Sequence, residues 1–171
     1  ASDYSHSVSL SSDGTIVAIG AEGNDGNGSG SGHVRVYEYS DSSWNQIGGD
    51  IDGETANDYS GKSVSLSSDG TIVAIGAVYN DDNGTNSGHV RVYQYSSDSW
   101  TQLGDDIDGE ATGDKNGISV SLSSDGTIVA IGAYQNDGNG ASSGHVRIYQ
   151  YSDPSWNQIG GDIDGETAND Y

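Results

Sequence analysis

Apolar and polar residues alternate over short stretches, and one such pattern occurs three times along the chain. In residues 7–11, Val8 and Leu10 alternate with serines, as in a half-buried strand. Residues 15–21 are apolar on both faces, so a strand here must be covered from both sides. The Ser-Asp-Gly between them is turn chemistry, because Asp and Gly tolerate the left-handed backbone region. The pattern predicts a β-hairpin.

This hairpin segment is identical in all three copies. The copies occupy residues 7–21, 63–77 and 119–133, so the spacing is 56 residues both times. A constant period of this length is typical of repeat proteins, in which each unit buries its apolar face against its neighbours. We therefore treat the chain as three copies of one β unit.

The remainder of each repeat predicts two more strands. An eleven-residue loop rich in Asn, Asp, Gly and Ser (22–32 in the first copy) leads to alternating residues 33–39 and then to a stretch that begins at Trp44. Strands are expected near 6–11, 15–21, 33–39 and 44–48, with negligible helix. Four antiparallel strands with aromatic residues at fixed places are typical of a propeller blade.

The expected fold is therefore all-β, with three tandem four-stranded antiparallel blades of the β-propeller type. The expected repeats are residues 1–56, 57–112 and 113–171, the last including the start of a further repeat. Propellers close with 4–8 blades, so three blades form an incomplete ring or a segment of a longer array. We expect the outer faces to associate with other copies of the same repeat, from the same or neighbouring chains.

The charge balance excludes several partners. The chain has 5 Lys and Arg against 26 Asp and Glu, a formal net charge of −21. Phosphate backbones would be repelled, so nucleic acid is not expected as a partner. No apolar run is long enough to span a membrane, and membrane insertion is not expected. The absence of cysteine excludes disulfides and thiolate chemistry.

Three short motifs resemble a known family. Asp58-Tyr-Ser-Gly-Lys-Ser-Val64, Gly76-Ala77 and Gly88-His-Val-Arg-Val-Tyr93 are similar to the FG-GAP repeat of integrin-α-type propellers. The family's Phe is replaced by Ser60 and Asn116, and its Asp-rich calcium hairpin is reduced to Ser-Ser-Asp-Gly. The resemblance implies a propeller-type fold and an extracellular or cell-surface binding or structural role without catalysis, and it gives no calcium site at this hairpin.

Calcium is the candidate cofactor elsewhere in the repeat, although no cofactor is required. Short oxygen-bearing side chains separated by Gly can surround a hard cation that takes 6–8 oxygens. We expect any such site in the long loop, where the residues concerned are Asp25, Asn27, Asp81, Asn83, Asp137 and Asn139. Two of these, Asn27 and Asn83, also begin N-glycosylation sequons in exposed loops.

Other polar residues recur in register and have structural explanations. The Asp50, Asp52 and Glu54 cluster appears three times, which indicates scaffold rather than one active site; cation binding remains an alternative. His33 and its equivalents lie a blade apart, too far to share one ion, and are expected to make hydrogen bonds where the third strand begins. Blade-to-blade ion pairs are expected among Arg35, Arg91, Arg147, Glu54, Glu110 and Glu166.

The three tryptophans and eleven tyrosines allow two interpretations. They could form a carbohydrate-stacking surface, but Trp begins the fourth strand in every copy, which favours packing between blades. The predicted function is accordingly a non-enzymatic structural or adhesive module of an extracellular protein or filament. The alternative is a propeller that binds a glycan or peptide on its loop face.

Overall fold

The computed structural model describes residues 7–169 and contains only strands, turns and loops in this range. The start of the first expected strand, at residue 6, and the last two residues of the expected further repeat lie outside it. No helix in the described part of the chain has the length and apolar character needed to cross a bilayer.

The described part of the chain contains fifteen strands. They are β1 Ser7–Leu10, β2 Ile16–Ala21, β3 His33–Ser40, β4 Ser43–Gln46, β5 Ile51–Asp52, β6 Ser60–Leu66, β7 Ile72–Ala77, β8 His89–Ser96, β9 Ser99–Gln102, β10 Ile107–Asp108, β11 Asn116–Leu122, β12 Ile128–Ala133, β13 His145–Ser152, β14 Ser155–Gln158 and β15 Ile163–Asp164.

These strands form three antiparallel sheets of the same topology, which we call blade 1 (β1–β5), blade 2 (β6–β10) and blade 3 (β11–β15). In blade 1 the order is β1-β2-β3-β4, with β5 also paired to β3. Strand β4 pairs with the distal half of β3, and β5 pairs with its first two residues. The fourth strand is therefore shorter than expected and is continued, after an interruption, by β5. The four-stranded antiparallel blade is confirmed.

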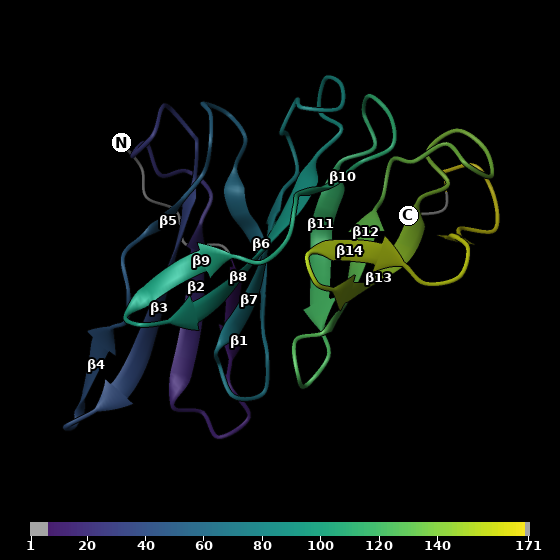
Figure 1. Ribbon diagram of the computed structural model, residues 1–171. Coiled ribbons are helices and arrows are strands. Elements are labelled where there is room, and N and C mark those ends of the chain that lie inside the picture. The colour runs from purple at the N-terminus through teal and green to yellow at the C-terminus, as the bar shows by residue number, and fades with distance from the viewer. Residues whose placement is uncertain (1–6, 170–171) are drawn as a thin grey trace.

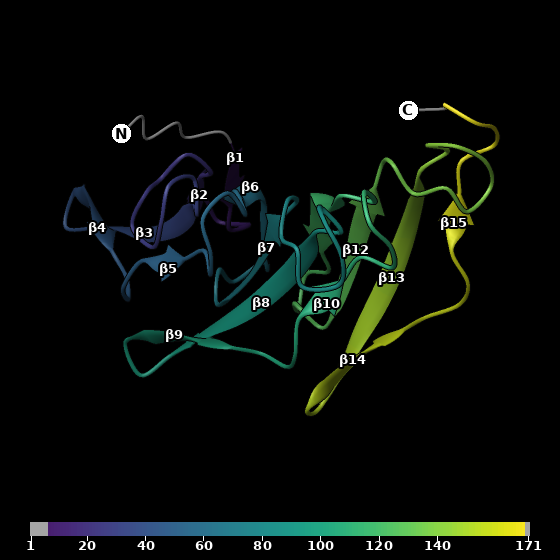
Figure 2. The ribbon, with the colours of Figure 1, turned by 90° about the horizontal axis from the view of Figure 1, so that it is seen from above.

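The three blades follow one another in an open row (Figure 1). The first strands of neighbouring blades lie against each other, because β6 contacts both β1 and β2 while β11 contacts both β6 and β7. Seen from above, the row runs from β4 at one end to β15 at the other and does not close into a ring (Figure 2). The long loops and the connectors between blades project from one edge, uppermost in Figure 1, which we call the loop face.

The hydrophobic core lies in the two joints between blades. We call the face of a blade that packs on the next blade its trailing face, and the face that packs on the previous blade its leading face. At the first joint the trailing face of blade 1 contributes Ala18, Val34, Val36 and Ile51, and the leading face of blade 2 contributes Val64, Leu66, Val73 and Ile75. The equivalent residues of blades 2 and 3 form the second joint. All of β7 is buried because blade 2 is covered on both faces, as the apolar pattern predicted.

Glycines set the distance between neighbouring blades. A bulge in β6 between Ser60 and Ser63 contains Gly61, whose φ is 85°, a conformation that other residues rarely adopt. A Cβ added to Gly20 would clash directly with the carbonyl oxygen of Gly61, and one added to Gly61 would lie 3.1 Å from the Gly20 Cα. Gly76 and Gly117 repeat this approach at the second joint. The backbones are therefore as close as two glycines permit.

Hydrogen bonds from side chains fix the joint around these glycines. Ser7 Oγ donates to Gly61 O at 2.8 Å, and Ser9 Oγ accepts from the amide of Leu66 at 2.9 Å. Their equivalents make the same bonds at the second joint, at 2.7 and 2.9 Å. The serines that alternate with Val8 and Leu10 therefore act between blades, which explains their polarity on an inner strand.

The tryptophans pack between blades, as expected. Trp100 Nε1 donates to Ile47 O of the previous blade at 3.0 Å, and its ring lies against Gly48. Trp156 donates to Leu103 O at 2.7 Å in the same way. Trp44, on the outer face of blade 1, is 48% exposed. The packing interpretation is confirmed for the two tryptophans that have a preceding blade.

The hairpin turn is held by one carboxylate in each copy. Asp13 Oδ1 accepts from Ser11 Oγ at 2.7 Å, from Thr15 N at 3.0 Å and from Thr15 Oγ1 at 2.8 Å. These bonds lower the pKa of the Asp13 carboxyl from 3.8 to about 2, the Thr15 amide contributing most. In blade 3 the pKa of Asp125 is likewise lowered to about 2, chiefly by the Ser123 hydroxyl.

We predict that Gly76→Ala destabilises the chain far more than Gly132→Ala. The new Cβ of the first variant meets the backbone of Gly117, whereas at Gly132 the nearest atom is the side-chain oxygen of Ser119 and no glycine of another blade faces it. Forcing atoms into a closely packed joint costs roughly 1–3 kcal/mol or more. Urea unfolding at low protein concentration measures both variants. Equal losses would show that the close approach is not the controlling feature.

We predict that the hairpin carboxylates contribute to stability at neutral pH and lose this contribution in acid. Their folded-state pKa lies below the ordinary value, so the contribution is present above pH 4 and is lost as the pH falls towards 2. Side-chain carboxyl NMR should place the midpoints of Asp13 and Asp125 near 2, and the urea midpoint should fall over the same range. Titration midpoints near 4 would contradict the hydrogen-bonded turn.

Candidate functional site

Arginine side chains cross both joints to reach the segment that leaves the previous blade. Arg91 Nη1 lies 3.4 Å from Glu54 Oε1, and Nη2 donates to Asp52 O at 2.9 Å. Arg147 repeats both contacts, with Glu110 at 3.3 Å and Asp108 O at 3.0 Å. The guanidinium groups are buried, so the charge of each is balanced within the joint rather than by solvent.

Blade 1 uses its arginine differently. Arg35 donates from Nε and Nη2 to the two carboxylate oxygens of Asp50, at 2.9 and 2.8 Å, within the same blade. This bidentate contact lowers the pKa of Asp50 to about 2. Among the described residues no blade precedes blade 1, and none follows blade 3, where Glu166 lies exposed beyond β15. The structure therefore places two of the six expected partners, Arg35 and Glu166, outside any blade-to-blade pair.

Each blade also brings a buried histidine against carboxylates that are distant in sequence. His89 Nδ1 lies 3.4 Å from Asp106 Oδ2 and 3.9 Å from Glu54 Oε2. His145 Nδ1 lies 3.7 Å from Asp162 and 4.0 Å from Glu110, and His33 Nδ1 lies 3.6 Å from Asp50. From the sequence, the histidines and the carboxylates were expected to have separate roles. Their constant register in all three repeats was the signal that could have joined them.

The expected hydrogen bond at the start of the third strand is wrong for His145. Its two ring nitrogens are buried and have no hydrogen-bond partner among the described residues. The Nδ1 atom of His89 is in the same condition. The reason is that strand pairing satisfies the backbone at this position, while the carboxylates that face the imidazole, at 3.7 and 4.0 Å from His145 Nδ1, are too far away to accept a hydrogen bond.

The largest group of this kind lies at the first joint and has four members. The ligand-type atoms of Glu54, Asp82, His89 and Asp106 all lie within 4.8 Å of one another. Burial raises the pKa of Glu54, although Arg91 opposes this shift, and burial also raises the pKa of the nearby Asp108. The negative charges of Asp106 and Asp82 add to both shifts. Burial lowers the pKa of His89 to about 4, and Arg91 adds to this, so the imidazole is neutral near pH 7.

The long loop uses its candidate cation ligands in its own hydrogen bonds. Asp25 Oδ1 accepts from the amide of Gly30 at 2.8 Å, and Asn27 Nδ2 donates to Gly53 O at 3.0 Å. The four equivalent residues of the other two loops make the same contacts. The calcium site in this loop stays a prediction. Asn27 and Asn83 are exposed, as acceptors of glycans must be, and their occupancy also stays a prediction.

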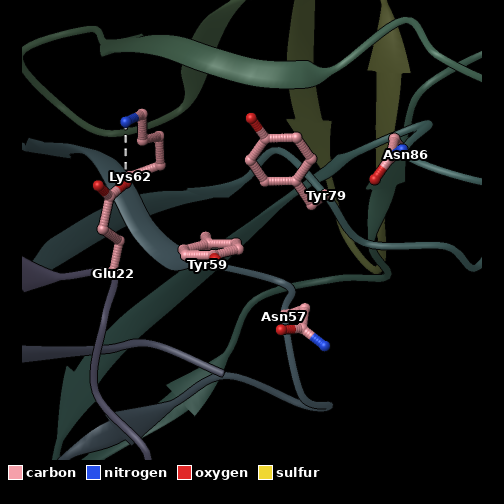
Figure 3. A pocket seen from close by; sticks show the side chains of 6 residues that line it. All are labelled: Glu22, Asn57, Tyr59, Lys62, Tyr79 and Asn86. Atoms are coloured by element: carbon pink, nitrogen blue, oxygen red, sulfur yellow. Dashed lines mark ion pairs between the residues drawn. The ribbon is translucent and has the colours of Figure 1, made fainter. Parts of the chain in front are cut away.

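A pocket of about 470 Å³ opens on the loop face at the first joint. It is lined by Glu22, Asn57, Tyr59, Lys62, Tyr79 and Asn86. Figure 3 shows the Lys62–Glu22 ion pair, 2.9 Å long, beside the two tyrosine rings. The tyrosine centroids are 5.3 Å apart in an edge-on arrangement. The pocket therefore combines aromatic surface with amide and charged groups.

Comparison with known proteins supports the propeller-type architecture. The sequence profile described as "FG-GAP repeat" matches residues 51–93 and 107–149, about half of the chain. No curated protein sequence is significantly similar to the chain.

Several solved structures share the fold at low sequence identity. A Bacteroides uniformis protein assigned as a 6-phosphogluconolactonase has a TM-score of 0.62 at 13% identity, over 98% of this chain and 43% of its own. Kuenenia stuttgartiensis hydrazine synthase scores 0.61 at 13% identity, covering 97% and 37%. Pseudomonas aeruginosa periplasmic gluconolactonase scores 0.57 at 16% identity, covering 91% and 44%. The chain spans less than half the length of each.

The two profile matches coincide with the joints. Each begins in the short last strand of one blade and ends in the third strand of the next, so it contains the close glycine, the buried histidine and the arginine. At the family's Phe position the chain has Ser60 and Asn116, both buried, and Asn116 Nδ2 donates to Ile107 O at 2.9 Å. The chain belongs to the FG-GAP repeat family, and its three sheets are blades of the β-propeller type.

Proposed function

We propose that this chain is a non-enzymatic structural or adhesive module of an extracellular or cell-surface protein, and that it works by docking blade on blade. The single observation that carries the proposal is the match between its two outer faces. The outer face of blade 1 is a leading face and the outer face of blade 3 is a trailing face. Leading and trailing faces already pack together at the two joints within the chain.

The leading face of blade 1 has the apolar residues that the internal joints bury. Val8 and Leu10 are 70% and 60% exposed, whereas their equivalents Val64 and Leu66 in blade 2 are buried. Trp44 is exposed at the position from which Trp100 reaches into the first joint. A patch of large apolar side chains of this kind marks an interaction surface.

The trailing face of blade 3 presents the apolar residues of the other side of a joint. Val146 and Ile163 are exposed, with Ile163 at 58%, whereas their equivalents Val90 and Ile107 are buried in the second joint. The two halves are complementary because the same residue types already pack together twice. Another blade of this repeat, from the same or a neighbouring chain, therefore fits each outer face. Such a contact is head-to-tail, which gives rings or open filaments according to its rotation.

Two further observations support a scaffold rather than an enzyme. The histidine–carboxylate groups recur in every blade, whereas an active site is normally singular. The enzymes with similar folds share 13–16% identity with this chain, which carries the architecture and not their chemistry. The extracellular placement rests on the family resemblance and on a net charge of −21, which salt or divalent cations would screen.

We predict that the chain associates with increasing concentration in moderate salt and that Leu10→Lys returns it to a monomer. The variant places a charge in the leading face, where burial without a partner is costly. Thr101→Lys is the matched control, because it adds the same charge at an exposed position of the middle blade. Sedimentation velocity and light scattering read the mass. A wild-type monomer of 17.6 kDa at all concentrations would refute docking.

The pocket of the first joint favours a second candidate function, the binding of a glycan or peptide on the loop face. Tyr59 and Tyr79 offer aromatic surface, and Asn57, Asn86 and the Lys62–Glu22 pair offer hydrogen bonds around it. Sugars are recognised by this combination, because an aromatic ring covers the apolar face of a sugar while polar groups bind its hydroxyls.

For this second function we expect saturable binding on a glycan array that weakens about fivefold in Tyr79→Ala, because a lost aromatic contact is worth on the order of 1 kcal/mol. Tyr39→Ala is the control, since Tyr39 is exposed on blade 1 outside the pocket. An array without saturable binding, or equal binding by both variants, would leave docking as the function.

A further inference from the structure

We propose that the first joint binds a divalent transition-metal ion through Glu54, Asp82, His89 and Asp106. The site goes beyond the proposed function and does not depend on it, since it lies inside one chain and needs no second copy. Glu54 comes from the connector that leaves blade 1, and the other three come from blade 2. The ion would therefore tie two blades together.

The distances fit a small coordination sphere. A tetrahedral ion with ligands at about 2.1 Å separates any two of them by about 3.4 Å. His89 Nδ1 and Asp106 Oδ2 are 3.4 Å apart, and His89 Nδ1 and Glu54 Oε2 are 3.9 Å apart. The longest separation in the group is below 4.8 Å. Glu54 and Asp82 are exposed residues, so their side chains can move inwards and the ion can enter from solvent.

The buried histidine provides an observation independent of the acidic cluster. The His89 side chain is 1% exposed, and its Nδ1 atom points at the carboxylates without making a hydrogen bond. A buried polar atom with no partner is costly, and native structures rarely keep one without a reason. The Oδ1 atom of the neighbouring Asp108 is buried in the same unsatisfied state. A bound ion would satisfy the imidazole directly.

The charges around the histidine also favour a cation. Glu54, Asp82, Asp106 and Asp108 supply four carboxylates, and Arg91 is the one guanidinium that contacts them among the described residues. Burial of the His89 side chain favours the neutral imidazole, which is the form that donates its lone pair to a metal. A divalent ion would reduce the excess negative charge that burial otherwise makes unfavourable.

The ligand types indicate the class of ion. Imidazole together with carboxylates suits Zn²⁺, Fe²⁺ and similar transition metals, whereas Ca²⁺ and Mg²⁺ prefer oxygen alone. Only one ligand here is a nitrogen, but it is the buried and best-fixed member of the set. We therefore use Zn²⁺ as the probe and Ca²⁺ as the comparison.

The three blades form a natural series of this site. Blade 3 has Glu110, His145 and Asp162 but has Gly138 where blade 2 has Asp82. Blade 1 has His33, Asp50 and Asp52, with Gly26 at that position and with Asp50 already occupied by Arg35. The loop backbone is the same in all three, since the amides of Gly26, Asp82 and Gly138 donate to the equivalent Asn side chain at 2.7–2.9 Å. Blade 2 should therefore bind most tightly.

The test is calorimetric titration of the untagged chain with Zn²⁺. We expect one site of high affinity, at least tenfold weaker in Asp82→Gly and unchanged in Asp98→Asn, which removes a charge from an exposed turn. Gly138→Asp should create a second tight site in blade 3. Asp82→Gly introduces the residue that the other two blades have at this position, so we do not expect a folding failure to hide the result.

A second measurement identifies the histidine. Co²⁺ bound at the site should give visible absorption bands typical of a low-symmetry site with nitrogen ligation, and His89→Gln should remove them while Asp98→Asn should not. No stoichiometric Zn²⁺ binding, equal affinity in wild type and Asp82→Gly, or Ca²⁺ binding as tight as Zn²⁺ would each overturn the proposal. If the chain fails to associate in the sedimentation experiment, the metal-site proposal still stands, because the site lies within one chain.

Discussion

The contact between two glycines of successive blades is the constraint on which the rest of the structure depends. Where Gly20 meets Gly61, the inner strands approach until no side chain fits between them. Only at this separation can Ser7 and Ser9 bond across the joint, and only then do valines and isoleucines of facing sheets interdigitate. The tryptophan and the arginine extend the same joint outwards from this point. The glycines that mark the family are therefore spacers between blades, and the apolar core forms around them.

Most of the fold could be predicted from the sequence, because its determinants are local and are repeated. Alternation around Val8 and Leu10, the Asp-Gly turn and the doubly apolar second strand lie within fifteen residues, and three copies make the pattern unambiguous. The short β5 was missed because Ile51 and Asp52 are too brief a stretch to show a period. The grouping of His89 with Glu54 and Asp106 was missed for a different reason. The constant register indicates that these residues are related, but it does not show that Glu54, from the connector that leaves blade 1, lies against the histidine of blade 2, because that contact depends on how the two blades pack.

Differences between the copies are as informative as their identity. The hairpin sequence is the same in every copy because the hairpin strands form the same contacts at equivalent joints. The loops vary, and they are where the blades acquire individual properties, such as Asp82 in place of a glycine or the pair of tyrosines that lines the pocket of the first joint. A uniform scaffold with variable edges lets a repeat protein change what it binds without disturbing what holds it together.

Each blade is also folded from one continuous stretch of chain, which enters at the inner strand and leaves through the short fifth strand. A pulling force applied along the polypeptide would therefore load the blades in series rather than together. Release of one 56-residue repeat would add about 190 Å of extended chain, since each residue spans roughly 3.4 Å. A row of such blades would therefore lengthen in steps under tension and shorten again as the blades refold, which is the mechanical behaviour of an elastic element.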